Sequence, residues 1–479
     1  MLVYLDAFFI VNILLTLSVI FMERKNTAST WAWIMIMLFV PILGFVLYLF
    51  LGQDMHKRKT FNKKEEEDYF FHLLHGQTIR LNEHLNEFED IISDPYQSVL
   101  RLHLLGHDSL FTKDNVVKIY TDGTEKFADL FESLKAASSY IHMEYYIIRN
   151  DFLAKALCEI LIQKASEGVE VLLLYDGMGC LRTSRSLFKK LKAGGVQVCV
   201  FFPPFIPYIN LRINYRNHRK ICVVDGDVAY TGGFNIGAEY IGLDKKMGYW
   251  RDTHLQIIGS AVQMLELPFL LDWRFASPSH HIDLEKYISY RTPNLIGNTG
   301  IQVVTSGPDS KHPCIRNGYV KMINSAKHFI YIQTPYFIPD EGVLTAIKLA
   351  ALSGIDVRIM IPNKPDHLFV HWASYSYIGE VLASGAKCYT YEKGFLHAKT
   401  IVIDDEICSV GTSNFDIRSF TLNFEVNSFI YDSIISGRLG EIFHQDLMNC
   451  KEITLEGYEN RGYMIKFKES ISRLVGPIL

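Results

Sequence analysis

The sequence predicts an α/β protein built from two tandem α/β/α sandwich modules with pseudo-twofold symmetry, preceded by an N-terminal transmembrane helical hairpin. Three observations support this fold class. Strand-like and helix-like segments alternate through residues 138–175, the same plan returns over residues 325–361, and long apolar runs stand at the N-terminus. Such alternation is typical of a sheet covered by helices on both faces. A repeated unit of this kind indicates two copies of one module.

The composition narrows the class of protein further. The chain has 479 residues, of which 49% are hydrophobic and 21% charged, and its net charge is −4. Proteins that bind nucleic acid usually carry a basic domain or stripe, so this balance argues against a nucleic-acid partner. The eight cysteines form no C-x-x-C pair, and we interpret them as reduced thiols in the protein core.

Two apolar segments predict membrane-spanning helices over about residues 2–22 and 31–51, each close to the roughly 20 residues that cross a bilayer. A cleaved signal peptide is disfavoured because the first segment lacks a basic start and a small-residue cleavage site. Basic residues at 57–59 and 63–64 follow the second segment. The positive-inside rule therefore predicts a multi-pass protein of the cell membrane whose large C-terminal part is cytoplasmic.

These patterns predict four regions: the hairpin at 1–55, a basic and then mixed helical linker at 56–108, module 1 at 109–285 and module 2 at 286–479. Module 2 ends in an amphipathic helix over about 464–475, which either lies on the membrane or packs against the domain. The aromatic and proline-rich segment 201–209 likewise either enters the bilayer or covers the core.

Each module carries the same chemical string near its end. In both copies a lysine follows a histidine by two positions, an aspartate follows it by seven and an asparagine by seventeen. The β-branched residues after each lysine predict a strand, and the period of two puts histidine and lysine on one face. The first string is His218, Lys220, Asp225 and Asn235, and the second is His397, Lys399, Asp404 and Asn414.

Brought together across a twofold axis, the two strings would surround one small anionic group, for which phosphate is the natural candidate. Lys220 and Lys399 supply positive charge, and the amides of Asn235 and Asn414 supply hydrogen-bond donors. One histidine can attack phosphorus while the other protonates the departing oxygen, and the second step then reverses the proton transfer. This scheme is ping-pong transfer through a phosphohistidine. It requires no metal or cofactor, and we expect none.

Carboxylates complete the predicted site. Each imidazole needs an orienting carboxylate that fixes its tautomer, and Asp252 and Glu425 follow the histidines of their own copies at comparable intervals. Asp225 and Asp404 belong to the repeated catalytic string. Because they stand at strand ends before turns, we expect their role to be structural and electrostatic.

The two strings resemble the duplicated H-x-K-x4-D signature of the phospholipase D superfamily, and they match it at each histidine, lysine and aspartate. The likeness covers roughly residues 110–479. The hairpin, the residues leading into the first string and the segment 451–455 are similar to bacterial cardiolipin synthases.

This resemblance implies reversible, metal-independent transfer of a phosphatidyl group between two phosphatidylglycerol molecules of the bilayer, giving cardiolipin and glycerol. By the same analogy His218 is the nucleophile and His397 the acid, an assignment that sequence symmetry alone leaves open. Hydrolysis to phosphatidic acid and transfer to another alcohol also stay open, because water or any alcohol can attack a phosphohistidine. An inactive membrane scaffold is disfavoured, since both strings are intact. The sequence makes no prediction of oligomeric state.

Overall fold

The computed structural model describes residues 10–18, 27–45, 48, 94–203, 214–277, 282–288 and 297–476. These residues fall into two compact units. One unit comprises Met1–Glu66 with Pro204–Tyr215, and the other contains both repeated modules. Most of the predicted segment 201–209 lies outside the described residues.

The N-terminal unit contains two helical segments that contact each other. Residues 10–18 are helical, and α2 spans Thr27–Phe39. The Asn12 side chain donates to the Met37 carbonyl at 3.2 Å, so the two segments lie side by side as in a hairpin. α2 ends two residues before Pro41, because proline lacks an N–H and disfavours helical geometry in the residue before it, and residues 43–45 and 48 are helical again.

Within the described ranges, no helix combines the length and the apolar character needed to cross a bilayer. Large parts of the predicted spans 2–22 and 31–51 lie outside the described residues.

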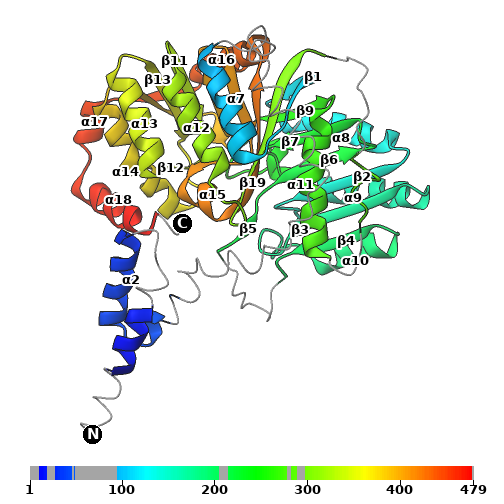
Figure 1. Cartoon of the computed structure of the whole chain (residues 1–479), viewed down its shortest axis with the longest axis horizontal. Helices are drawn as coiled ribbons and strands as arrows, with labels where there is room; N and C mark the ends of the chain where they lie inside the picture. The colour runs from blue at the N-terminus through cyan, green and yellow to red at the C-terminus, as the bar shows by residue number, and fades with distance from the viewer. Residues whose placement is uncertain are drawn as a thin grey trace. The chain divides into compact units, whose positions relative to one another are not determined.

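The second unit is built on one 16-stranded sheet to which both modules contribute (Figure 1). The first module supplies β1 (Phe111–Tyr120), β2 (Tyr140–Tyr145), β3 (Glu170–Asp176), β4 (Gln197–Phe201), the short β5 (Arg216–Asn217), β6 (Lys220–Val224), β7 (Val228–Gly232) and β9 (His254–Ile258). The second supplies β10 (Thr299–Ser306), β11 (Phe329–Gln333), β13 (Asp356–Pro362), β14 (Lys387–Tyr391), β16 (Thr400–Ile403), β17 (Ile407–Gly411), β19 (Asn423–Tyr431) and the edge strand β20 (Cys450–Ile453).

The strand order confirms the predicted repeat. β1 and β10 pair antiparallel at the centre of the sheet. Outward from this pair the order is β9-β7-β6-β2-β3-β4 on one side and β19-β17-β16-β11-β13-β14 on the other. Apart from the edge strand β20, each of these strands thus has a counterpart at the same step in the other module, as expected for a pseudo-twofold axis through the central pair.

Helices cover the sheet and follow the predicted alternation. The first module has α8 (Gly123–Ala136), α9 (Phe152–Ser166), α10 (Arg185–Ala193) and α11 (Ala261–Ala276), and the second has α12 (Cys314–Ser325), α13 (Glu341–Leu352), α14 (Leu368–Ala383) and α16 (Ser433–Leu447). Four of them start after an aspartate whose side chain accepts a backbone N–H of the first turn, which stabilises the helix start; these are Asp122, Asp151, Asp340 and Asp432. Every residue of β2, β6, β16 and β19 is buried, so both faces of the sheet are covered.

One helix of the predicted linker is part of the second module. α7 (Asp94–His107) packs against α12, and its apolar residues Tyr96, Val99, Leu100 and Leu104 lie in the core of that module. The predicted C-terminal helix corresponds to α18 (Tyr463–Val475), which follows the short α17 (Leu455–Glu459).

Candidate active site

Short strands that cross between the modules bring the two histidines to the junction. β5 (Arg216–Asn217) pairs in parallel with the start of β19, and β15 (Gly394–Leu396) pairs in parallel with β8 (Tyr249–Arg251). The His218 N–H donates to the Phe424 carbonyl at 2.9 Å, and the His397 N–H donates to the Arg251 carbonyl at 2.7 Å. Each histidine is therefore anchored by its backbone to the other module.

The orienting carboxylates also come from the opposite module. His218 Nδ1 lies 2.9 Å from Glu425 Oε2, and His397 Nδ1 lies 2.6 Å from Asp252 Oδ2. Each of the two carboxylates proposed from the sequence does contact a histidine, but the histidine belongs to the other copy, so the pairing within one copy is wrong. A fully buried carboxylate behind Nδ1 holds the proton there, which leaves Nε2 as the nitrogen that can react.

The two lysines are fully buried beside the histidines. Lys220 Nζ donates to the His218 carbonyl at 2.6 Å, and Lys399 Nζ donates to the His397 carbonyl at 2.5 Å. Burial lowers the pKa of Lys220 to about 7 and that of Lys399 to about 8, and mutual repulsion adds to the lowering for Lys220.

The histidines share this environment. Burial lowers the pKa of His218 and of His397 to about 4 each, so both rings are neutral at pH 7 and one can act as a nucleophile. The positive charge of each copy's lysine lowers the pKa of the other copy's histidine as well as of its own. The two strings therefore form one electrostatic site.

Asp225 and Asp404 lie apart from this site, at the far ends of β6 and β16 from the lysines. Both adopt left-handed backbone geometry with φ of 54°. The Asp225 carboxylate accepts from the backbone N–H groups of residues 138–140, and Asp404 accepts from those of residues 327–329. These hydrogen bonds fix the turn at the start of the neighbouring strand. The two aspartates therefore lie too far from the histidines to belong with the reacting residues, where the repeated string had placed them.

The two asparagines differ in their contacts. Asn235 Oδ1 accepts from the Ile147 N–H at 3.1 Å, and its Nδ2 donates to the Tyr240 hydroxyl at 3.1 Å. Asn414 hydrogen-bonds to Asp416, but its buried Oδ1 has no hydrogen-bond partner among the described residues. Asn235 therefore supports its own module, whereas Asn414 retains a free acceptor.

Sequence reasoning missed a set of aromatic and charged residues around the histidines. The Tyr146 ring lies 4.9 Å from the His218 ring, and the Trp250 ring lies 5.2 Å from the His397 ring. Arg219, between His218 and Lys220, is buried and forms an ion pair with Asp272 of α11. Alternation along a strand directs Arg219 away from its two neighbours, a signal that could have indicated a buried partner.

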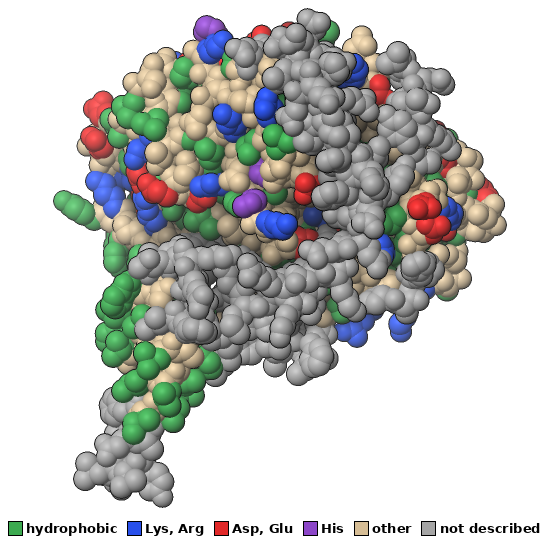
Figure 2. Space-filling view, viewed as in Figure 1, with side chains coloured by type: hydrophobic (Ala, Val, Ile, Leu, Met, Phe, Trp, Pro, Cys, Tyr) green, Lys and Arg blue, Asp and Glu red, His purple; other side chains and the backbone are tan. Residues whose placement is uncertain are grey.

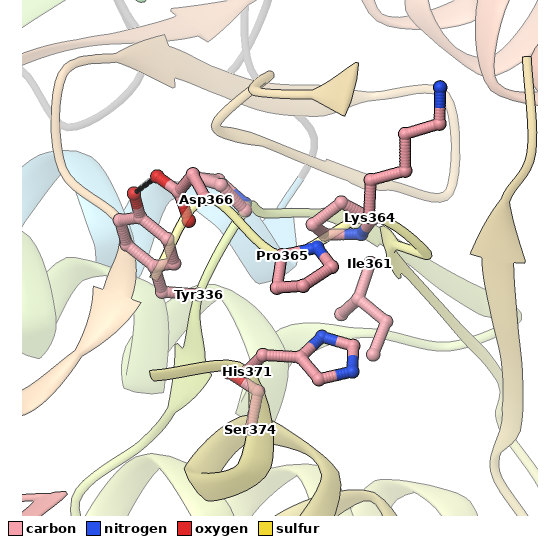
Figure 3. Close-up of a pocket in the computed structure, with 9 residues that line it drawn as sticks. Tyr336, Ile361, Lys364, Pro365, Asp366, His371 and Ser374 are labelled. Carbon is pink, nitrogen blue, oxygen red and sulfur yellow. Dashed lines mark hydrogen bonds between the residues drawn. The ribbon is translucent and has the colours of Figure 1, made fainter. Parts of the chain in front are cut away.

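A pocket opens in the second module, between the segment after β11 and the loop after β13 (Figure 3). The Tyr336 hydroxyl donates to Asp366 Oδ2 there, and the negative charge of Asp366 partly offsets the lowering of the Lys399 pKa. The pocket is lined by Pro335, Tyr336, Ile361, Pro362, Lys364, Pro365, Asp366, His371 and Ser374.

Comparison with known proteins agrees with the resemblance seen in the sequence. Residues 130–257 and 319–447 match the family model described as "Cardiolipin synthase, PLD-like domain", and residues 10–53 match one described as "Phospholipase D-nuclease N-terminal". The first two matches correspond to the two modules.

Curated relatives extend this similarity over nearly the whole chain. A cardiolipin synthase of Oceanobacillus iheyensis is 49% identical, with 98% of both chains covered. The major cardiolipin synthase of Bacillus subtilis is 48% identical over 100% of this chain and 99% of its own.

The fold also matches a solved structure, the phosphatidylserine synthase of Haemophilus influenzae, with a TM-score of 0.62 at 14% identity over 80% of this chain and 100% of that chain. At this identity the match supports the α/β fold alone. Together the family models and the full-length relatives show that the chain belongs to the phospholipase D-like cardiolipin synthase family.

Proposed function

We propose that the protein transfers a phosphatidyl group from one phosphatidylglycerol to another, giving cardiolipin and glycerol. The observation that carries this proposal is the pairing of two neutral imidazoles, each backed by a buried carboxylate of the opposite module, with two buried lysines. Such a site offers a nucleophile, an acid and positive charge around one phosphodiester.

In the first step His218 Nε2 attacks phosphorus, the bond from phosphorus to the glycerol oxygen breaks, and the glycerol oxygen takes a proton from His397. In the second step a hydroxyl of another phosphatidylglycerol attacks the phosphohistidine. His397 takes up the proton of that hydroxyl, and the bond from phosphorus to His218 breaks. The negative charge of a bound phosphodiester favours the imidazolium, which raises the low pKa of His397 so that it can act as the acid.

The proposed roles follow from these steps. His218 and His397 react, Lys220 and Lys399 stabilise phosphate charge, and Asp252 and Glu425 hold the rings. The unpaired Asn414 Oδ1 can accept from a hydroxyl of the lipid headgroup, not from phosphate oxygens. The existing contacts of Asn235 favour a supporting role within its own module.

The test is to incubate purified, detergent-solubilised full chain with phosphatidylglycerol and no cytidine nucleotide, and to resolve the lipids by mass. Cardiolipin with an equal amount of glycerol is the expected result. Phosphatidic acid as the only product would mean that water is the acceptor. The steps use side chains alone, so EDTA should leave the rate unchanged; strong inhibition that a divalent cation restores would contradict the mechanism.

The membrane arrangement is part of the same proposal: a multi-pass N-terminal hairpin with the catalytic modules on the cytoplasmic side. The apolar segments at 2–22 and 31–51 and the basic residues after them support it. The match of residues 10–53 to an N-terminal domain of phospholipase D relatives agrees with it.

α18 adds a second contact with lipid to this proposal. Its inward face is polar, with Glu469 and Ser472 only 3% and 1% exposed, whereas Tyr463, Phe467 and Leu474 are 92%, 60% and 83% exposed. In Figure 2, hydrophobic and basic side chains lie next to one another on the surface where α18 runs. A helix facing water has the opposite arrangement, so the apolar outer face of α18 fits a bilayer surface.

Replacing Phe467 by Glu tests this contact. The variant should lose about tenfold in rate on phosphatidylglycerol vesicles but keep its rate on a short-chain phosphatidylglycerol below its micelle concentration, since only the first substrate requires docking. Met448, 81% exposed elsewhere on the same unit, provides the matched control M448E. Equal loss on both substrates, or no loss on vesicles, would argue against membrane docking by α18.

A further inference from the structure

Two arginines lie next to the residues proposed to react, on the His218 side of the site. The first, Arg216, stands on β5 two positions before His218, so strand alternation places both side chains on the same face. Asn217 between them points the other way, toward α11, where its side chain donates to Asp272 Oδ2 at 3.2 Å. Arg216 is half-buried, and it continues the row of side chains that His218 belongs to.

The second arginine, Arg418, comes from the other module. It lies in α15 (Ile417–Thr421), and its carbonyl accepts from the Leu422 N–H at 2.8 Å. The next residue, Asn423, pairs with Arg216 in the ladder between β19 and β5, so this turn brings the two arginines together (Figure 1). Burial, and after it the positive charge of Arg216, lower the pKa of Arg418, a repulsion that a bound anion would relieve.

Tyr146 connects the arginine pair to the residues proposed to react. Its ring lies 4.9 Å from the His218 ring, and Lys220 Nζ lies 5.4 Å from the centre of the same tyrosine ring. The tyrosine hydroxyl also hydrogen-bonds to Arg216. One side chain therefore separates the arginines from the place where the lysines would hold phosphate.

The position equivalent to Arg216 in the second module is apolar. Phe395 stands two residues before His397, and it is fully buried. Its ring lies 4.8 Å from the Trp250 ring, and β15 pairs with β8 there as β5 pairs with β19 on the other side. The His397 side is thus closed by aromatic packing at the position where the His218 side has a half-buried arginine.

The position equivalent to Arg418 in the first module is acidic. Arg418 follows Asn414 by four residues, and Glu239 follows Asn235 by the same interval. Glu239 forms an ion pair with Arg149 at 2.9 Å within its own module. Both arginine positions thus depart from the pseudo-twofold symmetry that the histidines and lysines obey, and they do so on the same side of the site.

We propose that Arg216 and Arg418 bind the phosphodiester of the accepting phosphatidylglycerol and thereby favour this lipid as acceptor over water and uncharged alcohols. The proposal rests on the proposed function. Transfer between two phosphatidylglycerol molecules brings two phosphates into one site, and the lysine pair accommodates the phosphate that reacts. A guanidinium suits the other phosphate, because it can donate two parallel hydrogen bonds to phosphate oxygens.

The acceptor's own structure places its phosphate close to the first one. Only the glycerol carbons separate the attacking hydroxyl from that phosphate. Attack in line with the bond from phosphorus to His218 fixes the position of the attacking oxygen alone. Rotation about the glycerol carbons then lets the second phosphate turn toward Arg216 and Arg418.

The experiment compares two soluble acceptors, of which one carries the phosphodiester of the lipid headgroup. The full chain in detergent receives phosphatidylglycerol with equal concentrations of deuterated glycerol and glycerophosphoglycerol, and the lipid products are resolved by mass. All products arise from the same phosphohistidine, so the ratio of the two transfer products reports the second step alone. Neither acceptor has acyl chains, so contact of the protein with the membrane does not affect this ratio.

The wild type should favour glycerophosphoglycerol. Arg216→Gln and Arg418→Gln should each lower the ratio of the glycerophosphoglycerol product to the glycerol product about tenfold, as for a lost hydrogen bond to a charged group. Arg418→Lys keeps the charge but not the paired donors, so it should retain part of the preference. Arg149 at the equivalent place of the first module provides the matched control, and Arg149→Gln should leave the ratio unchanged.

A wild type that uses both acceptors equally would overturn the arginine site, as would an unchanged ratio in both glutamine variants. Equal loss of both transfer products and of phosphatidic acid in these variants would also overturn it, because the arginines would then support the whole site. In each case the proposed function would stand if cardiolipin still forms from phosphatidylglycerol. Wild-type protein that forms only phosphatidic acid would instead overturn the proposed function, and the arginine site with it.

Discussion

The two modules share strand order and the residues proposed to react, yet they hold those residues in different ways. In the first module, Asp272 of α11 pairs with Arg219, which stands inside the repeated string. In the second, Ala398 replaces that arginine, and Asp446 of α16 pairs instead with Arg251, which comes from the first module. The repeat thus conserves an arginine–aspartate pair under each half of the sheet while drawing the arginine from different strands.

The polar groups around these pairs differ as well. Glu144 on β2 lies beside Asp272, and burial together with this second carboxylate raises the pKa of Glu144. Its counterpart on β11 is the neutral Gln333, which donates to Asp446 at 2.8 Å. The halves are therefore equivalent in what reacts and different in what supports it, and neither half is complete without the other.

Removing either histidine should have the largest effect, because equivalent reacting groups act as a unit. His218→Ala and His397→Ala should each lower cardiolipin formation by about 10⁴-fold or more, with the thermal unfolding temperature preserved. Acid-labile phosphate on the wild-type chain that is missing from the His218 variant would identify the nucleophile. Wild-type kinetics in either variant would contradict a shared site.

Replacing a lysine should have the second-largest effect on the rate. Because the two lysines have different pKa values, the pH dependence of the rate should also distinguish the two modules. Lys220→Met or Lys399→Met should lower the rate about 10²–10³-fold, since a group that stabilises transition-state charge is lost. In the wild type, kcat/KM should fall as the pH rises through about 7, because Lys220 loses its proton there. Deprotonation removes the positive charge that holds phosphate, so kcat/KM decreases on the alkaline side of this pKa.

Arginine variants sharpen this test. Lys220→Arg should move the alkaline limb of kcat/KM toward the pKa of Lys399, about 8, whereas Lys399→Arg should leave the limb near the pKa of Lys220, about 7. Identical limbs in both variants would show that the two lysines are electrostatically equivalent.

Replacing the carboxylates that contact the histidine of the opposite module, Glu425 and Asp252, should have a smaller effect on the rate. Glu425→Gln and Asp252→Asn should each cost about 10–100-fold in rate, the usual scale for losing the partner that orients a histidine. ¹⁵N resonances of the imidazoles provide the sharper readout. Glu425→Gln should change the Nδ1 resonance of His218 and leave that of His397 nearly unchanged, and the reverse result would restore the pairing suggested by chain order.

Asp225 and Asp404 should have the smallest effect on chemistry. Asp225→Asn and Asp404→Asn should lower the free energy of unfolding by about 1–3 kcal/mol through weakened charge-assisted hydrogen bonds to backbone N–H groups, with the rate per folded molecule within a few-fold. Asp404 also accepts from the Tyr96 hydroxyl at 2.7 Å, so its variant should be the less stable of the two. Thermal unfolding and active-site titration separate the two quantities.

The features that could be predicted from the sequence are those encoded by patterns within short stretches of chain. Strand periodicity and the repeated spacing identify both modules, the histidines, the lysines and the candidate carboxylates, because these signals lie within short stretches of chain. The pairing of His218 with Glu425 depends on the two-residue strand β5, and that of His397 with Asp252 on the three-residue strand β15. Both strands are too short to leave a periodic signal. The packing of α7 on α12 and the ion pair of Arg251 with Asp446 of the other module are also long-range contacts, which no local sequence pattern encodes.

The crossed anchoring also sets an order of events during synthesis. Glu425 follows His218 by 207 residues, so a ribosome adding roughly 5–20 residues per second reaches it about 10–40 s later. Until then the first imidazole has neither its carboxylate nor the second lysine, and a half-made chain cannot cleave the lipids it meets. The reactive centre is assembled only when both modules exist, so an unfinished enzyme cannot release phosphatidic acid into the membrane.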